Sequence, residues 1–325
     1  MSPLPDDLNQ RIRAFQESRV ILTALELDLF SAVGQGNGAA ETAAKLGTDP
    51  RATEMLLNAL AGIGLLVKKD GVFHNSPEAQ RHLAAGSPDN ARLALLHTAH
   101  LWRTWSTLTD AVRAGTSVAP EAPCPPDWTE AFIAAMHRNA AERAPLVVRA
   151  VGAKRVRHML DIGGGSGAYS IAFAHANPEL RADILDLAAV GPIARRHIED
   201  AGVTSRVQVR AGDLRADALG HGYDLAFLSA ICHMLSEAEN GDLLRRCHEA
   251  LIPGGRIVIQ DFILDPDKTS PRFAALFALN MLVGTPGGNS YSEPEYAAWL
   301  EDAGFDEVHR VRLPGPTGLM IGTRP

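Results

Sequence analysis

The chain has 325 residues, of which 46% are apolar and 21% charged, and this composition excludes disordered, collagen-like and disulfide-scaffold proteins. Because domains commonly hold about 100–200 residues, we expect two domains or one large domain with an appendage. The net charge of −7 disfavours nonspecific binding to nucleic acid or to anionic membranes.

The cysteines predict neither a disulfide framework nor a structural metal site. There are three, Cys124, Cys232 and Cys247, with no CxxC or Cys/His finger spacing. The N-terminus lacks a signal pattern, and the longest apolar run, 273–283, is shorter than the roughly 20 residues that cross a bilayer. We therefore expect a cytoplasmic protein with no metal and no membrane partner.

The first 75 residues have the pattern of a winged helix-turn-helix. Apolar spacing predicts helices over 8–32, 39–46 and 49–62, the last beginning at a capping residue followed by proline. Asp70-Gly71 between two short apolar runs predicts a β-hairpin.

The charge of this segment disfavours DNA binding. Residues 1–95 hold nine Lys or Arg and eleven Asp or Glu, and the third helix contributes only Arg51 as a cation. Because phosphate binding needs clustered cations, we expect a packing or dimerisation module and no nucleic-acid partner.

The rest of the chain changes from helices to alternating strands and helices. Helical segments over 90–115 and 128–151, joined by a proline-rich loop at 120–126, predict a bridge. The following elements are strands at 156–162, 182–187, 206–211, 223–231 and 256–264, helices at 169–176, 190–201, 239–251 and 293–303, a tight turn at 253–255, and a final hairpin of 308–313 with 319–323. Such alternation predicts a parallel sheet covered on both faces, closed by an antiparallel hairpin.

A glycine-rich loop carries the first functional signal. The segment 161–167, DIGGGSG, follows a predicted strand and opens a helix. It fits both the nicotinamide pattern, with Gly163, Gly165 and Ala168, and the S-adenosylmethionine (SAM) pattern, with Asp161 and the glycines at 163, 165 and 167.

Two further acids follow at strand ends, and the second of them favours SAM over a nicotinamide. Asp186 ends the second strand and can accept both ribose hydroxyls in either class, whereas Asp213, after the third strand, suits the exocyclic amine of adenine in SAM enzymes. The reversed hairpin also suits a seven-stranded methyltransferase sheet. Each acid alone is equally well explained as a helix or turn cap.

Residues 8–325 resemble the bacterial and plant small-molecule O-methyltransferases of the caffeic-acid and hydroxyindole type. The motifs that carry this resemblance are LDIGGGSG (160–167), DL (186–187), AGD (211–213), SAICHMLSEAE (229–239), PGG (253–255) and EDAGF (301–305). The family implies an α/β fold: a Rossmann-like seven-stranded methyltransferase domain with an N-terminal α-helical winged-helix dimerisation domain. We therefore expect a homodimer with a dimerisation domain over 1–90, a helical bridge over 91–152 and a SAM-binding catalytic domain over 153–325.

The resemblance implies SAM as cofactor, S-adenosylhomocysteine as product and a defined binding set. The expected cofactor-binding residues are Asp161, Gly163, Gly164, Gly165, Gly167, Asp186, Leu187, Asp213, Leu214 and Ser229.

The family also implies a general base at His233, directly after the fourth strand. A histidine suits this role because its ordinary pKa near 6.5 leaves a neutral imidazole at neutral pH. The matching orienting acid is Asp261. Ser290 stands where plant members carry Glu, and the usual HDW is His233-Met234-Leu235, so a plant-like phenolic substrate is not implied.

The expected acceptor is a small aromatic or polyketide-like hydroxyl compound. Candidate wall residues are Trp102, Phe132, Met136, Phe277, Asn280 and Met281, although such spacing is also typical of a core or a dimer interface. The alternatives are a C- or N-methyltransferase or a non-methylating SAM enzyme on the same fold, a ligand-sensing winged-helix regulator, and a nicotinamide oxidoreductase.

Overall fold

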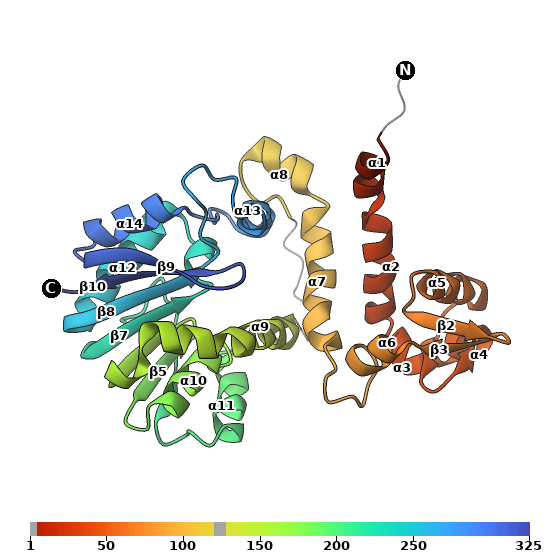
Figure 1. The fold of residues 1–325 in the computed structure, drawn as a ribbon, viewed down its shortest axis with the longest axis horizontal. Coiled ribbons are helices and arrows are strands. Elements are labelled where there is room, and N and C mark those ends of the chain that lie inside the picture. The colour runs from red at the N-terminus through yellow and green to blue at the C-terminus, as the bar shows by residue number, and fades with distance from the viewer. Residues whose placement is uncertain (1–4, 120–127) are drawn as a thin grey trace. The chain divides into compact units, whose positions relative to one another are not determined.

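The computed structural model describes residues 5–119 and 128–325 (Figure 1). Contacts divide the chain into two compact units, 1–102 and 103–325. The predicted loop at 120–126, with Cys124, lies outside the described residues. The expected three-part division with boundaries after 90 and 152 stays a prediction.

The first unit combines short helices with a small antiparallel sheet of strand order β1-β3-β2. Its elements are α1 (Asp6–Arg13), α2 (Phe15–Glu26), α3 (Leu29–Val33), β1 (Asn37–Gly38), α4 (Ala39–Leu46), α5 (Pro50–Gly62), β2 (Leu66–Lys69), β3 (Val72–Asn75), α6 (Pro77–His82) and most of α7 (Arg92–Trp105).

Local sequence explains most of these elements. The Asp49 side chain caps α5 by accepting from the Ala52 N–H at 2.8 Å, as the sequence predicts. The hairpin turn has φ of +50° at Asp70 and +81° at Gly71, which suits a two-residue connection. The single helix over 8–32 is wrong: α1 ends at Arg13, and Asp28 adopts φ of +56°, which separates α2 from α3.

The second unit is an α/β domain. Its elements are the end of α7, α8 (Leu108–Ala114), α9 (Trp128–Val151), a 3₁₀ turn (Ala153–Arg155), β4 (His158–Ile162), α10 (Ala168–Ala176), β5 (Arg181–Asp186), α11 (Gly191–Asp200), β6 (Val207–Ala211), β7 (Tyr223–Ser229), a 3₁₀ turn (Cys232–Met234), α12 (Glu237–Ala250), β8 (Leu251–Asp261), α13 (Arg272–Gly284), α14 (Glu293–Asp302), β9 (Asp306–Arg312) and β10 (Gly318–Thr323).

The seven-stranded sheet has the order β6-β5-β4-β7-β8-β10-β9. The strands from β6 to β8 are parallel, and β10 runs antiparallel to both of its neighbours, so the expected closing hairpin is confirmed. Figure 1 shows α12 and α14 over one face of the sheet and α9, α10 and α11 over the other.

Alternating side chains along each strand supply the two cores. On β4, Leu160 and Ile162 join the core beneath α12 and α14, whereas Met159 joins the core beneath α9, α10 and α11. On β7, Phe227 joins the second of these. Near-continuous apolar strands are therefore required, because both faces of the sheet are buried.

The strand around Pro253–Gly255 differs from the expected tight turn followed by a strand over 256–264. The turn residues lie inside β8, where the pairing with β7 jumps from Tyr223↔Leu251 to Leu225↔Arg256. Gly254 takes φ of +76° in this irregularity. The strand ends at Asp261, three residues earlier than expected.

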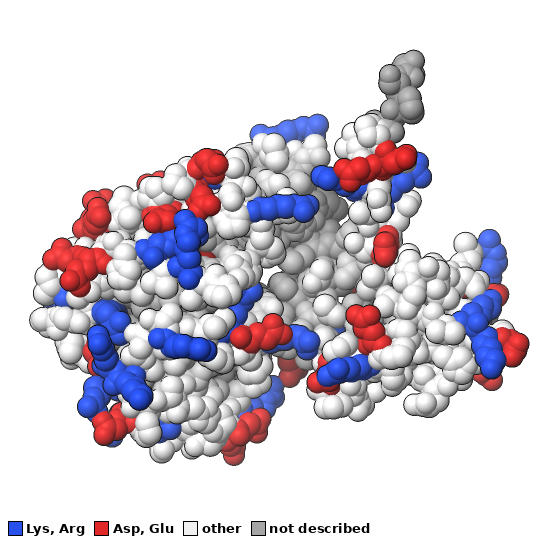
Figure 2. All heavy atoms as spheres, viewed as in Figure 1, with Lys and Arg blue, Asp and Glu red and all other residues white. Residues whose placement is uncertain are grey.

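Charges of both signs alternate on the visible face of each unit (Figure 2). The apolar run at 273–283 lies within α13, a helix that the sequence did not specify. Over residues 5–119 and 128–325, no helix is long and apolar enough to cross a membrane.

We expect Phe227→Ala to lower the free energy of unfolding by about 3–5 kcal/mol, the usual cost of removing a buried aromatic ring. The Phe227 ring is fully buried and lies 5.0 Å from the Tyr169 ring and 5.9 Å from the Phe173 ring. Urea unfolding followed by circular dichroism measures the change. Val112→Ala, at a side chain 60% exposed, is the control and changes stability by less than about 0.5 kcal/mol. A similar small effect at Phe227 would contradict this packing.

Candidate functional site

The candidate site is the carboxyl edge of the parallel strands. The chain order of the strands reverses between the neighbours β4 and β7, and open α/β sheets hold ligands at such a point. Four predicted site residues lie at this edge: Asp161 in β4, Asp186 ending β5, Ser229 ending β7 and Asp261 ending β8.

The glycine loop connects β4 to α10 and is tied to β5. Gly165 has φ of +57°, and its N–H donates to Asp186 Oδ2 at 2.7 Å. A Cβ at Gly164 would lie 2.8 Å from the Asp161 carboxyl carbon, so a side chain there would collide with the strand end. Gly163 and Gly167 also have positive φ, a conformation that favours glycine, so the backbone of the loop explains why glycines stand at these positions.

Asp161 is a buried carboxyl beneath this loop. Its Oδ2 accepts from the Ser170 hydroxyl at 2.6 Å, and its Oδ1 has no partner among the described residues. Burial raises the pKa of Asp161 to about 7; the Ser170 hydrogen bond opposes this rise and the nearby Asp186 adds to it. An unpartnered, buried oxygen at this place can accept a hydrogen bond from a ligand.

Asp186 holds two backbone groups at the end of β5. Its Oδ2 accepts from Gly165 and its Oδ1 accepts from the Leu187 N–H at 2.7 Å. Partial burial raises the pKa of Asp186, although both hydrogen bonds favour the charged form. Each carboxylate oxygen has a second lone pair, so Asp186 can also accept from a ligand hydroxyl.

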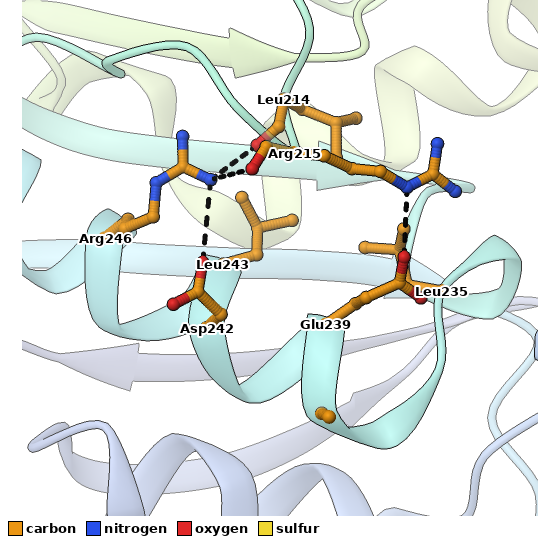
Figure 3. Close-up of a pocket in the computed structure, with 8 residues that line it drawn as sticks. Leu214, Arg215, Leu235, Glu239, Asp242, Leu243 and Arg246 are labelled. Atoms are coloured by element: carbon orange, nitrogen blue, oxygen red, sulfur yellow. Dashed lines mark hydrogen bonds and ion pairs between the residues drawn. The ribbon is translucent and has the colours of Figure 1, made fainter.

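Asp213 and Leu214 lie in a turn held against α12. Asp213 Oδ1 accepts from the Arg215 N–H at 2.9 Å, a turn-capping contact. Figure 3 shows the Arg246 guanidinium directed at the carbonyls of Leu214 and Arg215, at 2.7 and 3.3 Å, while Arg215 pairs with Glu239 at 3.1 Å. The residues that make these contacts, Leu214 among them, line a pocket of about 290 Å³. They fix the turn that carries the predicted adenine-binding residues.

The chain bends sharply between β7 and the turn that holds His233. Ser229 donates its hydroxyl to Gln260 Oε1 on β8 at 3.2 Å. Ala230 adopts φ of +59°, a conformation costing an L-residue about 1 kcal/mol or more, and its N–H donates to the Gln260 carbonyl at 3.0 Å. Strain of this kind is found at sites where the surrounding structure over-determines the backbone.

His233 and Asp261 form a buried pair. The His233 Nδ1 lies 2.6 Å from Asp261 Oδ1, and the His233 backbone N–H donates to Asp261 Oδ2 at 3.2 Å. The two side chains are 7% and 1% exposed. Because the carboxylate accepts the proton on Nδ1, this arrangement leaves Nε2 as the acceptor of the neutral ring.

Aromatic rings surround the His233 imidazole. The Phe277 ring on α13 meets it edge-on at 4.8 Å, and the Phe262 ring lies 6.0 Å away. Phe262 also contacts Phe277 at 4.4 Å and Phe273 at 4.9 Å. An imidazole with apolar aromatic neighbours can remove a proton from a hydroxyl on a flat, apolar molecule.

The other acceptor candidates lie on several elements. Phe132 and Met136 are half-buried on α9, and Met281 on α13 is 7% exposed. Asn280 accepts from the Trp105 indole N–H at 2.8 Å, so part of its polar group is already engaged. Trp102 belongs to the first unit, where the Arg19 guanidinium lies 5.8 Å from its ring centre. A role in acceptor binding stays a prediction for all of these residues.

The structure adds polar neighbours that the motifs did not identify. His137 Nδ1 lies 2.9 Å from the hydroxyl of Ser166 in the glycine loop, and its ring stacks on that of His197 at 4.1 Å. Burial lowers the pKa of both histidines. His137 directly follows the candidate residue Met136, but a single histidine on a helix does not indicate a site. Because Ser166 is 29 positions away, no local spacing in the sequence could predict that the two side chains meet. In the described parts of the chain, no group of three or more His, Cys, Asp or Glu is placed to hold a metal ion.

Comparisons with known proteins identify the family. Residues 105–306 match the family model of the O-methyltransferase domain, and residues 10–85 match that of the O-methyltransferase dimerisation domain. The chain is 36% identical to a 3-hydroxy-5-methyl-1-naphthoate 3-O-methyltransferase of Streptomyces sahachiroi, over 95% of this chain and 92% of that protein. It is 31% identical to the tetracenomycin polyketide synthesis 8-O-methyl transferase TcmO of Streptomyces glaucescens, over 99% and 97%.

A solved structure described as PigF with SAH superposes with a TM-score of 0.90 at 29% identity, covering 99% of this chain and 100% of that one. The family models span both the helical N-terminal unit and the seven-stranded domain, and the relatives align along nearly their whole lengths. This chain therefore belongs to the O-methyltransferase family with an N-terminal dimerisation domain, and it is a SAM-dependent O-methyltransferase.

Proposed function

We propose that SAM binds at the carboxyl edge of β4, β5 and β6. Asp186 accepts from the ribose hydroxyls and Asp213 from the adenine amine, with Leu187, Leu214 and Ser229 beside them. The rest of the SAM site is lined by Asp161 and by the glycines at 163, 164, 165 and 167. The unpartnered Asp161 oxygen, the crowding at Gly164 and the second lone pairs of Asp186 support this fit.

We further propose that His233 is the general base and Asp261 its orienting acid. When bound, SAM supplies an electrophilic methyl group. Asp261 holds the Nδ1 proton, which presents His233 Nε2 to the acceptor. Nε2 takes the hydroxyl proton, and the oxygen gains the electron pair that makes it nucleophilic. The single observation that carries this proposal is the buried 2.6 Å contact between the two side chains at the end of β8.

The acceptor that this site suits best is a small hydroxylated aromatic or polyketide-like compound. Phe262, Phe273 and Phe277 give the region around His233 flat apolar surfaces. Of the relatives that align along nearly the whole chain, one is named for methylating 3-hydroxy-5-methyl-1-naphthoate and another is named as an 8-O-methyl transferase of tetracenomycin polyketide synthesis. Met136, Phe132, Trp102, Asn280 and Met281 remain candidate wall residues.

We also propose that the enzyme works as a cytoplasmic homodimer without nucleic-acid, membrane or metal partners. The match of residues 10–85 to the dimerisation domain supports self-association. The described cysteines, Cys232 and Cys247, are both buried thiols, as expected in a reducing compartment.

Asp186→Asn should weaken SAM binding at least 10-fold, because it removes a charged acceptor of ligand hydroxyls and loosens Gly165. A hydrogen bond to a charged group contributes about 1.5–3 kcal/mol. Isothermal titration calorimetry with S-adenosylhomocysteine, and with oxidised nicotinamide dinucleotide as the negative ligand, measures this.

Asp183→Asn is the matched control for this change. Asp183 lies on the same strand and accepts from His158 and from the Tyr223 hydroxyl, away from the carboxyl edge. It should leave SAM affinity within about twofold. Equal affinity in the Asp186 variant and the unchanged enzyme would refute the ribose contact.

His233→Ala should lower kcat by about 100-fold or more with SAM affinity retained, since general-base catalysis contributes about 10²–10⁴-fold. Asp261→Asn should also lower kcat, because the amide can no longer fix the tautomer by accepting through a charged oxygen. The assay follows mass-resolved O-methyl product from a panel that begins with 3-hydroxy-5-methyl-1-naphthoate.

His248→Ala is the control for the loss of a histidine ring. His248 also contacts a phenylalanine, Phe305 at 5.1 Å, but it lies near the end of α12 away from the proposed base. Near-normal kcat in the His233 variant would remove that residue from the mechanism.

A further inference from the structure

We propose that Tyr296 is a positioning residue of the His233–Asp261 pair, whose hydroxyl fixes the Asp261 carboxylate and moderates its pull on the imidazole. The catalytic consequence of this inference rests on the proposed roles of His233 and Asp261. The contact itself does not, so the two can be tested separately.

The Asp261 carboxylate is held by four donors. Oδ1 accepts from His233 Nδ1 at 2.6 Å and from the Phe262 N–H at 2.8 Å. Oδ2 accepts from the His233 N–H at 3.2 Å and from the Tyr296 hydroxyl at 3.1 Å. A carboxylate offers about four lone-pair sites, so these donors fill it. Within the described ranges 5–119 and 128–325, Tyr296 supplies the one side-chain donor to Asp261 besides the imidazole itself.

Tyr296 brings this hydroxyl from a separate element. It lies in α14, 35 positions after Asp261, and is 1% exposed. Its ring meets those of Trp299 at 5.6 Å and Tyr291 at 6.1 Å. Packing therefore fixes the ring, and burial together with the Asp261 charge raises the pKa of Tyr296 well above its ordinary value. The hydroxyl thus stays a neutral donor at working pH.

Two titratable groups near the pair, Cys232 and Tyr291, stay neutral near neutral pH. Burial raises the pKa of the Cys232 thiol well above its ordinary value, and Asp261 adds to that rise. Burial raises the pKa of Tyr291 to about 12, with Glu295, Cys232, Glu237 and Glu239 contributing. Phe262 and Phe277 contribute apolar rings. Neither Cys232 nor Tyr291 therefore adds a charge change of its own near neutral pH to the measurement at His233.

The direction of the effect follows from charge sharing. A hydroxyl that donates to Oδ2 draws negative charge away from Oδ1, which weakens the hold of Asp261 on the imidazolium form of His233. Without that donor, the carboxylate stabilises the charged ring more strongly. Tyr296 therefore keeps His233 in its neutral, proton-accepting form to a lower pH than Asp261 alone would allow.

The test is the titration of His233 in Tyr296→Phe, followed by NMR on protein labelled with ¹⁵N-histidine and complexed with S-adenosylhomocysteine. We expect the midpoint to move to higher pH by about half a unit or more. The acid limb of the kcat profile should move with it, so that kcat falls by up to about threefold at pH values below the midpoint and little at pH values well above it.

Tyr291→Phe is the matched control. The Tyr291 hydroxyl is also buried in this cluster, but it donates to the Leu235 carbonyl at 2.5 Å and not to Asp261. Both variants lose a buried hydrogen bond, so a general loss of packing would move both titrations alike. In an Asp261→Asn background, Tyr296→Phe should no longer shift the His233 midpoint.

A shift in the Tyr296 variant alone supports the proposal. An unchanged midpoint, or equal shifts in both tyrosine variants, would overturn it. Two separate results would distinguish the proposals. If His233→Ala keeps full activity while Tyr296→Phe still shifts the His233 midpoint in the otherwise unchanged enzyme, the proposed base fails and the positioning contact stands.

A second measurement tests the proposal if the Tyr296→Phe variant fails to fold. Incorporation of 3-fluorotyrosine into Tyr291→Phe makes the remaining tyrosine hydroxyls stronger donors, so the His233 midpoint should move to lower pH. An unchanged or raised midpoint would contradict the proposal.

Discussion

The parallel pairing of β4 with β7 is the constraint on which the functional edge depends. Because the chain leaves these neighbouring strands in opposite directions along the sheet, their connections separate and open a crevice at the carboxyl ends. The glycine loop leaves β4 on one side of that crevice, and the His233 turn leaves β7 on the other. The apolar strands, buried on both faces, keep this edge rigid.

The acids at this edge occupy different electrostatic environments. Asp161 is buried with one hydrogen bond, and its pKa rises to about 7. Asp186 is less buried and accepts two backbone N–H groups. Asp261 is as buried as Asp161 but has four donors, including the imidazole. Burial disfavours the charged form of a carboxyl group and hydrogen bonds from donors favour it, and at Asp161, with its single hydrogen bond, burial is the larger effect.

The surroundings of His233 combine a polar side with an apolar side. Asp261 meets the ring at Nδ1, whereas the Phe277 and Phe262 rings lie against its other surfaces. Such a division is what the proposed base would need in order to meet a hydroxyl on an apolar molecule. Ser290 is buried, and its hydroxyl has no partner among the described residues, so the side that bears Glu in plant members carries no charge from this position.

The sequence by itself determined the alternation of strands and helices from β4 to β8, the closing hairpin, the cap of α5, the hairpin at Asp70-Gly71 and the acids at strand ends, but not the helix α13. These predicted features depend on periodicity and local backbone preferences, which involve only a few neighbouring residues and can therefore be predicted from the sequence. Local patterns predicted one helix over 8–32 and a tight turn at 253–255, and so missed the break at Asp28 and the bulge around Gly254. Packing decides where a helix stops and which residues of two strands pair. Only the tertiary structure brought Tyr296 to Asp261 and His137 to Ser166, since contacts between separate elements leave no local pattern.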